Sequence, residues 1–145
     1  MSYRILDLFA GYAGWSQAFK EAGHEVVTVD FEARFNPTIV ADITRLRPDD
    51  VPGQWDIILG SPPCQKFSIA TVFRNWNKPG RVYEPKSEEA AHALGLIATT
   101  LRLIEALEPR YWILENPRGL LRKLPIMVPY ERRTVTFCQY GDDRM

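Results

Sequence analysis

The chain has 145 residues and no net formal charge, with 46% hydrophobic and 25% charged side chains. These values fit one folded domain with its own core, and they exclude a disordered segment or a strongly basic coat for nucleic acid. No apolar run approaches the roughly 20 residues of a membrane-spanning helix, and Asp7 interrupts the first apolar stretch, unlike in a signal peptide. Two cysteines, Cys64 and Cys138, are too few for a disulfide framework and fit a reducing cytoplasm.

Short apolar runs alternate with helical patterns along most of the chain. A first helix carries Trp15 and Phe19 on its apolar side, and a longer second helix begins after Ser87 and ends before Pro109. The predicted strands cover residues 4–9, 25–29, 39–41, 55–59, 111–114 and 132–138. Because strands and helices alternate, we expect an α/β fold with a largely parallel sheet, in one domain over residues 1–145.

Glycines follow the first predicted strand at Gly11 and Gly14, where the first helix is about to begin. Glycines at such a turn let a ligand approach the backbone, with the helix N-terminus facing it. Asp30 ends the next strand about 20 residues after Gly11, which is where Rossmann-type units place a carboxylate that binds ribose hydroxyls. The glycines alone indicate only a tight turn, but together with Asp30 they predict a nucleotide-like cofactor.

Cys64 follows the predicted strand 55–59, in the stretch Pro-Pro-Cys-Gln-Lys-Phe-Ser. Open α/β sheets bind ligands at the carboxyl ends of their strands, and the two prolines constrain the backbone that carries the thiol. A thiolate is a strong nucleophile that forms covalent intermediates. A lone cysteine is more often a small buried side chain, so its neighbours in the sequence decide the interpretation.

Glu115 follows the predicted strand 111–114 in the stretch Glu-Asn-Pro, and we expect it at the same edge of the sheet as Cys64. Its simpler interpretation is a glutamate in solvent at the rim of the sheet.

Residues 66–86 show no sustained period and predict a long loop, which in a compact domain is usually functional or disordered. Cationic side chains alternate there with aromatic ones, namely Phe67, Phe73, Trp76 and Tyr83. Cations bind phosphates and aromatic rings stack on exposed bases, so the pattern predicts contact with nucleic acid. The alternative is a solvated loop whose aromatic rings pack onto the domain.

Three of these motifs resemble, in the same order, those of the DNA cytosine-5 methyltransferases: Asp-Leu-Phe-Ala-Gly at 7–11, Pro-Pro-Cys-Gln at 62–65 and Glu-Asn at 115–116. The resemblance implies a Rossmann-like fold that binds S-adenosylmethionine, and double-stranded DNA as the partner, with no membrane. It implies that Cys64 attacks C6 of a flipped cytosine while Glu115 donates a proton to N3. The residues it assigns to the cofactor are Phe9, Gly11, Gly14, Asp30, Asp42, Ile43 and Pro62.

Asp42 and Ile43 follow the third predicted strand, where the family contacts the adenine of the cofactor; an aspartate here is equally well explained as a turn residue at a strand end. The family usually has a second glycine in place of Ala13, a glutamate in place of Asp30 and a valine in place of Pro117. Its arginine-bearing motif is matched only in part, with Arg144 as a third candidate catalytic residue.

The family continues into a target-recognition region and a C-terminal helix, whereas this sequence ends at Met145. The resemblance therefore implies a catalytic domain whose C-terminal part is missing, with target recognition supplied by a missing region or a separate chain. Without that helix, we expect an open apolar patch near Leu8 and Trp15 that favours association.

Three other functions fit the sequence. A tRNA cytosine-5 methyltransferase of the same family would differ in acting on RNA. A second enzyme could add a group other than methyl at C5 on the same scaffold. An inactive binding module, which the early end favours, would have no need to bind S-adenosylmethionine.

Overall fold

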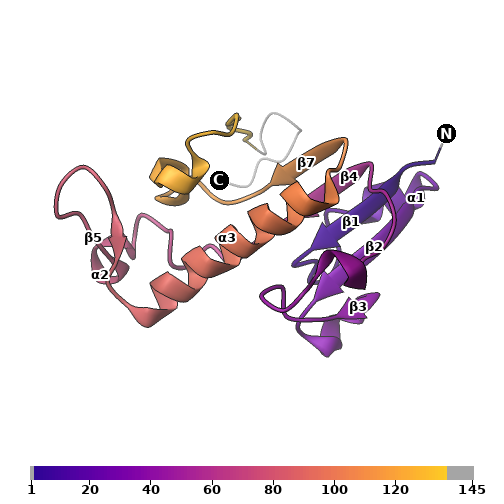
Figure 1. Ribbon diagram of the computed structural model, residues 1–145, viewed down its shortest axis with the longest axis horizontal. Coiled ribbons are helices and arrows are strands. Elements are labelled where there is room, and N and C mark those ends of the chain that lie inside the picture. Colours follow the sequence, from indigo (N-terminus) through magenta and orange to yellow (C-terminus); the bar gives the residue numbers. More distant parts are fainter. Residues whose placement is uncertain (1, 137–145) are drawn as a thin grey trace.

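A five-stranded sheet lies at the centre of the computed structural model, which describes residues 2–136 (Figure 1). Its strands are β1 (Arg4–Leu8), β2 (Glu25–Asp30), β3 (Ile39–Val40), β4 (Ile57–Gly60) and β7 (Tyr111–Leu114). They are arranged in the order β3-β2-β1-β4-β7, and each neighbouring pair is parallel. The predicted α/β fold with a parallel sheet is confirmed.

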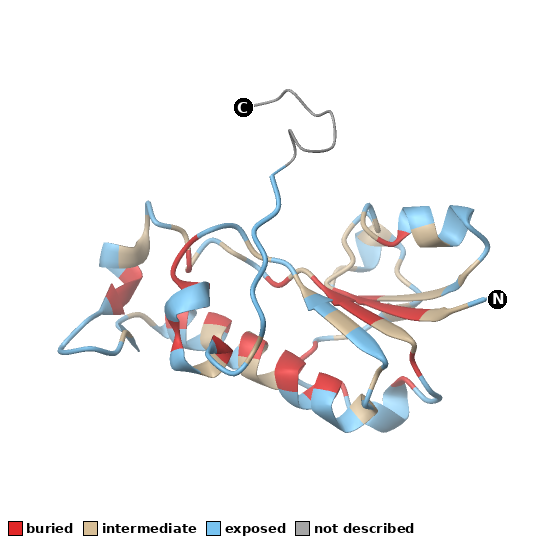
Figure 2. Ribbon diagram, turned by 90° about the horizontal axis from the view of Figure 1, so that it is seen from above, coloured by how far each residue is buried: buried red, intermediate tan, exposed pale blue. Residues whose placement is uncertain are grey.

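Helices lie on both sides of this sheet (Figure 2). The short helix α1 (Gln17–Glu21) lies on one side and the long helix α3 (Glu88–Leu107) on the other. The remaining elements are α2 (Val72–Asn75), the antiparallel pair β5 (Trp76–Asn77) and β6 (Glu84–Pro85), and the 3-10 turns η1 (Ala33–Phe35), η2 (Pro48–Asp50), η3 (Leu121–Lys123) and η4 (Pro125–Met127).

The ends of α3 follow from the residues that bound it. The Ser87 hydroxyl accepts a hydrogen bond from the Ala90 N–H, and acidic residues occupy the first turn, where the helix dipole favours them. The helix ends at Glu108, which has left-handed backbone angles and precedes a proline. By length and composition α3 is apolar enough to cross a membrane, but its buried stripe packs in the protein core as a central helix does.

The core consists of two clusters along α3. The first lies between the sheet and the C-terminal half of α3, and it includes Leu6, Ile58 and Ile104. The second joins the N-terminal half of α3 to the segments that follow Cys64 and Glu115, through residues such as Phe67, Trp76, Ile97, Leu121 and Leu124. The partly buried Trp112 packs against both clusters. The segments that carry the candidate catalytic residues are therefore anchored in the core.

Three local predictions are wrong. The first helix, α1, has only five residues and begins at Gln17, so Trp15 lies before it and not within it. Residues 66–86 are ordered into α2 and the β5–β6 pair, because Asn75 bonds to Thr71 and Lys86 and so closes the segment on itself. Residues 131–136 form no strand and are exposed. A strand needs a partner edge, and the Arg132 guanidinium is instead held by the Arg122 carbonyl.

Within residues 2–136, the two side chains expected at an open apolar patch are not exposed. Leu8 is fully buried, because it points toward α3 in the first core cluster, and Trp15 is half-buried. Exposed apolar side chains of the sheet lie instead on both edge strands, where Tyr111 and Ile113 of β7 are 58% and 50% exposed and Val40 of β3 is 56% exposed.

Candidate active site

The order of the strands reverses between β1 and β4. From β1 the chain proceeds to β2 and β3 on one side, and then returns to β4 and β7 on the other. In open α/β sheets the carboxyl ends of the two strands at such a switch point form the ligand crevice. The turn at residues 9–14 leaves β1 there, and the segment 61–68 leaves β4. The predicted cofactor turn and Cys64 thus lie at one crevice.

The turn after β1 has an unusual backbone. Phe9, Gly11 and Ala13 all have positive φ angles, 60°, 51° and 55°. A residue other than glycine pays about 1–2 kcal/mol for this conformation, so the turn is strained at Phe9 and at Ala13, where the family usually has its second glycine. Gly14 is exposed and Phe9 is half-buried beside the first core cluster.

Asp30 holds this turn in place. Its Oδ2 accepts a hydrogen bond from the Gly11 N–H at 2.9 Å, and its Oδ1 accepts one from the Glu32 N–H at 2.9 Å. The side chain is buried, with 7% of its surface exposed. Each carboxylate oxygen retains a second lone pair for a ligand. Asp30 therefore has a structural role in addition to the predicted contact with ribose.

Asp7 is a buried carboxylate next to this turn that the sequence did not mark as a site residue. Only 2% of it is exposed, and it accepts a hydrogen bond from the Ser16 hydroxyl. Burial raises the pKa of the Asp7 carboxyl above its ordinary value; the Ser16 hydrogen bond lowers it, and the negative charge of Asp30 raises it. The sequence contained a signal for Asp7, namely a charged residue inside an otherwise apolar predicted strand.

Replacing Asp7 by asparagine should change how stability depends on pH. Because the folded pKa is raised, ionisation favours the unfolded chain, and stability falls as pH rises from the unfolded pKa through the folded one. Asparagine keeps an acceptor for Ser16 and has no charge. We expect the free energy of unfolding of Asp7→Asn, relative to the wild type, to rise between pH 4 and pH 7 in denaturant titrations. A difference that is independent of pH would contradict this.

Asp42 and Ile43 follow β3. The Asp42 Oδ1 accepts hydrogen bonds from the Thr44 N–H at 2.9 Å and the Thr44 hydroxyl at 2.8 Å, and the backbone bond, followed by the hydroxyl, lowers the Asp42 pKa. Hydrogen bonds among the described residues leave its Oδ2 unused, and the side chain is exposed. Ile43 is a core residue with 5% exposure, so a ligand can contact mainly the backbone of Ile43 and little of its side chain. The assignment of both residues to a cofactor stays a prediction.

Cys64 and Glu115 follow neighbouring strands. Gly60 of β4 pairs with Leu114 of β7, and the Glu115 N–H continues the ladder to the Gly60 carbonyl at 2.8 Å. Glu115 is exposed and Cys64 is half-buried. The sheet therefore delivers both side chains to the same edge, as predicted.

Two hydrogen bonds join the segments that carry these residues, one on each side of Cys64. The Asn116 side-chain amide donates to the Pro62 carbonyl at 3.1 Å, and the Leu120 N–H donates to the Phe67 carbonyl at 2.8 Å. We call this pair of bonds the loop clamp. Because it fixes residues 62 and 67, the four residues between them, which include Cys64, cannot move freely relative to Glu115.

Gly119 makes the loop clamp possible. A Cβ atom on Gly119 would lie 2.3 Å from the Phe67 carbonyl oxygen, far inside any real contact. Only glycine lets the two backbones approach so closely. Sequence reasoning missed Gly119, although a glycine three residues after Asn116 was a signal for a close approach.

Asn116 also has a buried acceptor, because its Oδ1 has no hydrogen-bond partner among the described residues. Such an acceptor is where the N–H of a ligand or a water molecule fits. The next residue, Pro117, has no N–H to offer.

The structure corrects the expected stacking surface of residues 66–86. Phe67 and Trp76 are 1% and 4% exposed, and both belong to the second core cluster. Phe73 is 64% exposed, with the Arg74 guanidinium 5.3 Å from its ring centre. Tyr83 is half-buried. Two of the four aromatic rings are therefore packing residues: Trp76 of β5, and Phe67 in the turn that follows Cys64.

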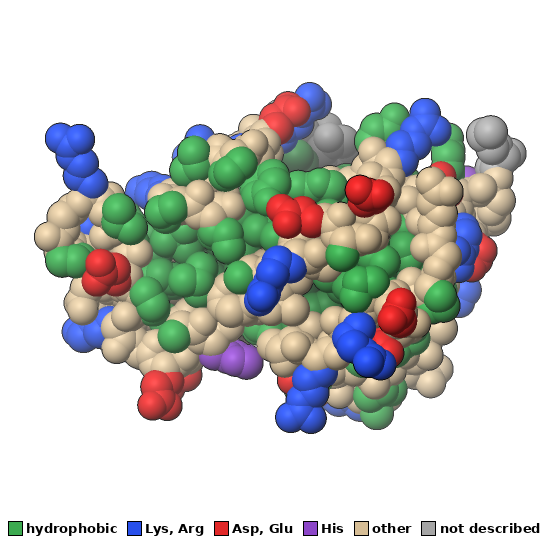
Figure 3. Space-filling model, viewed as in Figure 1, with side chains coloured by type: hydrophobic (Ala, Val, Ile, Leu, Met, Phe, Trp, Pro, Cys, Tyr) green, Lys and Arg blue, Asp and Glu red, His purple; other side chains and the backbone are tan. Residues whose placement is uncertain are grey.

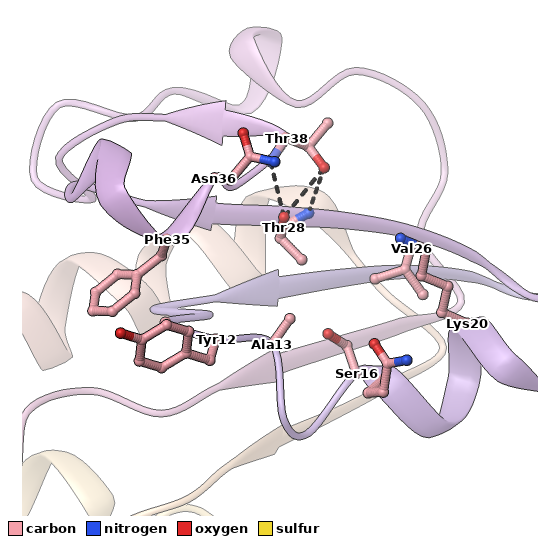
Figure 4. A pocket seen from close by; sticks show the side chains of 11 residues that line it. Tyr12, Ala13, Ser16, Lys20, Val26, Thr28, Phe35, Asn36 and Thr38 are labelled. Atoms are coloured by element: carbon pink, nitrogen blue, oxygen red, sulfur yellow. Dashed lines mark hydrogen bonds between the residues drawn. The ribbon is translucent and has the colours of Figure 1, made fainter.

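A pocket of about 200 Å³ borders the cofactor turn on the α1 side of the sheet (Figure 4). Gly11 and Ala13 line it, and Tyr12 meets Phe35 edge to face at one end, with ring centres 4.8 Å apart. The pocket runs along β2, and neither Asp30 nor Asp42 lines it. It is therefore a neighbour of the crevice and not the crevice itself.

Two assignments cannot be placed. Arg144 and Cys138 lie outside the described residues. Within residues 2–136 there is no group of three or more His, Cys, Asp or Glu side chains that could hold a metal ion.

The parallel sheet, its switch point and the glycine turn bonded to an aspartate define a Rossmann-like protein of the methyltransferase type. Its fold is similar to that of the Dnmt2 methyltransferase of S. pombe, with a TM-score of 0.57 and 17% identity over 88% of this chain and 38% of the other. Residues 3–125 match the model of the family described as C-5 cytosine-specific DNA methylase. The chain belongs to this family.

Curated relatives are consistent with this assignment. The type II methyltransferase M.NgoFVII of Neisseria gonorrhoeae is 33% identical over 130 residues, which cover 81% of this chain and 31% of the relative. A probable DNA (cytosine-5)-methyltransferase of Frog virus 3 is 29% identical over 144 residues, which cover 96% of this chain and 64% of the relative. The chain thus spans about a third of the bacterial relative and about two thirds of the viral one.

Proposed function

We propose that this chain is the catalytic part of an enzyme that transfers a methyl group from S-adenosylmethionine to C5 of cytosine in double-stranded DNA. The observation that carries the proposal is the loop clamp, which holds the Cys64 segment against the Glu115 segment beside the glycine turn. A structural thiol needs no such fixation. The relatives named type II methyltransferases support a role in restriction–modification.

The residues of the crevice fit S-adenosylmethionine. The backbone turn at Gly11 leaves room beside it, the Asp30 carboxylate has lone pairs for ribose hydroxyls, and the free Asp42 Oδ2 suits an adenine amino group. Two buried carboxylates, Asp7 and Asp30, lie near enough to interact and favour a cationic ligand. When bound, the cofactor supplies an electrophilic methyl group on a sulfonium.

The reaction assigns one task to each catalytic residue. The Cys64 thiolate adds to C6 of the cytosine, and Glu115 donates a proton to N3 as charge develops on the ring. S-adenosylmethionine, held by the Gly11 turn, Asp30 and Asp42, would supply its methyl group to the electron pair at C5, and its sulfur would keep the electrons of the broken bond. Loss of the C5 proton to a base breaks the bond between C6 and the Cys64 sulfur, and return of the N3 proton to Glu115 restores the neutral ring.

The target cytosine has to leave the duplex before Cys64 can reach C6. Target recognition is then supplied by a segment beyond this chain or by a separate chain, in keeping with the longer relatives. The enzyme acts inside the cell, where its DNA substrate is found.

Transfer of labelled methyl groups tests the reaction and its substrate. With labelled S-adenosylmethionine and a duplex that carries a mispaired cytosine, which leaves the stack at the lowest cost, we expect label in the DNA, no label in RNA of the same sequence, and none with Cys64→Ala. Label in RNA alone would move the assignment to a tRNA-type enzyme. Cofactor binding without transfer to either polymer would contradict the proposed reaction.

Asp30 can be tested through cofactor binding. A hydrogen bond to a charged group contributes roughly 1.5–3 kcal/mol, so Asp30→Ala should weaken S-adenosylmethionine binding about ten- to a hundredfold in calorimetry. Since Asp30 also holds the Gly11 N–H, Asp30→Asn is the matched variant: it keeps the size and one acceptor, and should lose less. Equal affinity in wild type and Asp30→Ala would remove Asp30 from the cofactor site.

A further inference from the structure

A groove of about 340 Å³ lies between the loop that follows Cys64 and the segment that follows Glu115. Ile69 and Tyr83 line it from the first segment, and Arg118, Arg122 and Lys123 line it from the second. These are the segments that the loop clamp joins. The groove is therefore built into the frame of the candidate active site. We call it the basic groove.

Positive charge is concentrated here although the whole chain is neutral. Arg118, Arg122 and Lys123 are exposed, no aspartate or glutamate lines the groove, and none of the three takes part in an ion pair among the described residues. Two further cations border it. The Arg132 guanidinium bonds to the Arg122 carbonyl at 2.6 Å, and the Lys78 ammonium lies 5.0 Å from the centre of the Tyr83 ring.

Apolar surface accompanies this charge. Ile69 is 72% exposed, and Val72 and the half-buried Tyr83 extend the apolar wall. In the space-filling view, hydrophobic side chains gather over the part of the molecule that holds α2 and β5 and continue along α3, with charged side chains of both signs around them (Figure 3). Cations beside apolar and aromatic side chains suit a ligand made of phosphates, sugars and bases.

We propose that the basic groove binds the sugar–phosphate backbone of DNA next to the target cytosine, an inference that rests on the proposed function. Guanidinium groups bind phosphate oxygens through paired hydrogen bonds, and unpaired cations have no competing partner to release. Ile69 and Tyr83 then contact the sugars or bases. The groove thus positions the strand without reading its sequence.

The distance along the chain supports this place. Arg118 follows Glu115 by three residues, so their Cα atoms are at most about 11 Å apart. A base within reach of Glu115 therefore has its own phosphates within reach of the Arg118 side chain. Arg122 and Lys123 follow on the η3 turn, further along the groove.

The salt dependence of DNA binding tests the basic groove. Fluorescence anisotropy with a labelled duplex that carries a mispaired cytosine is measured between 50 and 200 mM salt, for wild type and for Arg118→Gln, Arg122→Gln, Lys123→Gln and the triple variant. Each lost phosphate contact should reduce the magnitude of the slope of log affinity against log salt by about 1. It should also weaken binding at low salt about tenfold. Arg102→Gln is the matched control, since Arg102 is exposed on α3 and its hydrogen bonds within residues 2–136 go to Ala98 and Thr99 of the same helix.

The outcomes separate the groove from the reaction. All variants change exposed side chains, and circular dichroism verifies their fold. An unchanged slope in the triple variant overturns the proposal that the basic groove binds DNA, and it leaves the methyl-transfer proposal standing. If the slope is reduced in the variants but the wild type transfers no methyl group, the result supports DNA binding by the basic groove and contradicts the proposed reaction. Polyglutamate serves as a competitor that carries negative charge but no sugar or phosphate. If it displaces the duplex as effectively, per charge, as unlabelled DNA does, the assignment to a nucleic-acid backbone is overturned.

Discussion

Duplex DNA with 5-fluorocytosine at a mispaired target position is expected to trap the protein in a complex that survives denaturation. If Cys64 adds to C6, the covalent adduct breaks down only when the substituent at C5 leaves as a cation. A proton can do so and fluorine cannot, so the adduct should accumulate after methyl transfer and depend on S-adenosylmethionine. A mispaired base is used because it leaves the duplex at the lowest cost. Denaturing gel electrophoresis measures the complex.

Variants assign the adduct to individual residues. Cys64→Ala should form none, whereas Cys138→Ala should form the wild-type amount, since it retains Cys64. Glu115→Gln should form the adduct about a hundred- to ten-thousandfold more slowly, because its amide cannot supply the proton to N3. An adduct that persists in Cys64→Ala, or that disappears only in Cys138→Ala, would falsify the assignment of the nucleophile.

The five strands of the parallel sheet and the places of Cys64 and Glu115 could be predicted from the sequence because short apolar runs and the carboxyl-end rule are local signals. A residue directly after a buried parallel strand has little choice of position. The same rule brought the turn at Gly11 and Asp30 together, and the structure adds the hydrogen bond between them.

Contacts between distant segments could not be predicted in this way. The contact of Gly119 with Phe67 joins residues on opposite sides of α3 in the sequence, and no local pattern indicates it. Phe67 and Trp76 were misjudged for a related reason. Aromatic rings beside cations suit both nucleic acid and a packed core, and only the tertiary arrangement of the turn after Cys64 and of β5 decides which they contact. The irregular 131–136 segment likewise depends on whether an edge of the sheet is available.

Replacing Gly119 by alanine should slow adduct formation about a hundredfold. The new Cβ would lie 2.3 Å from the Phe67 carbonyl oxygen, a backbone atom that cannot rotate away, so one of the two segments has to shift. The shift breaks the hydrogen bond from Leu120 to Phe67 and displaces Cys64 relative to Glu115. A misplacement of about 1 Å in a catalytic group can cost on the order of a hundredfold in rate. The free energy of unfolding should fall by about 1–3 kcal/mol.

Gly95→Ala is the matched control, because Gly95 is an exposed residue within α3 and its new Cβ would contact nothing within 4 Å. It should raise the free energy of unfolding by about 0.5–1 kcal/mol and leave adduct formation unchanged. Calorimetry separates positioning from general damage, since the new Cβ contacts Phe67 and Pro117 and not the turn at Gly11, so Gly119→Ala should still bind S-adenosylmethionine with wild-type affinity. If Gly119→Ala forms the fluorocytosine adduct as fast as the wild type, the loop clamp does not position Cys64.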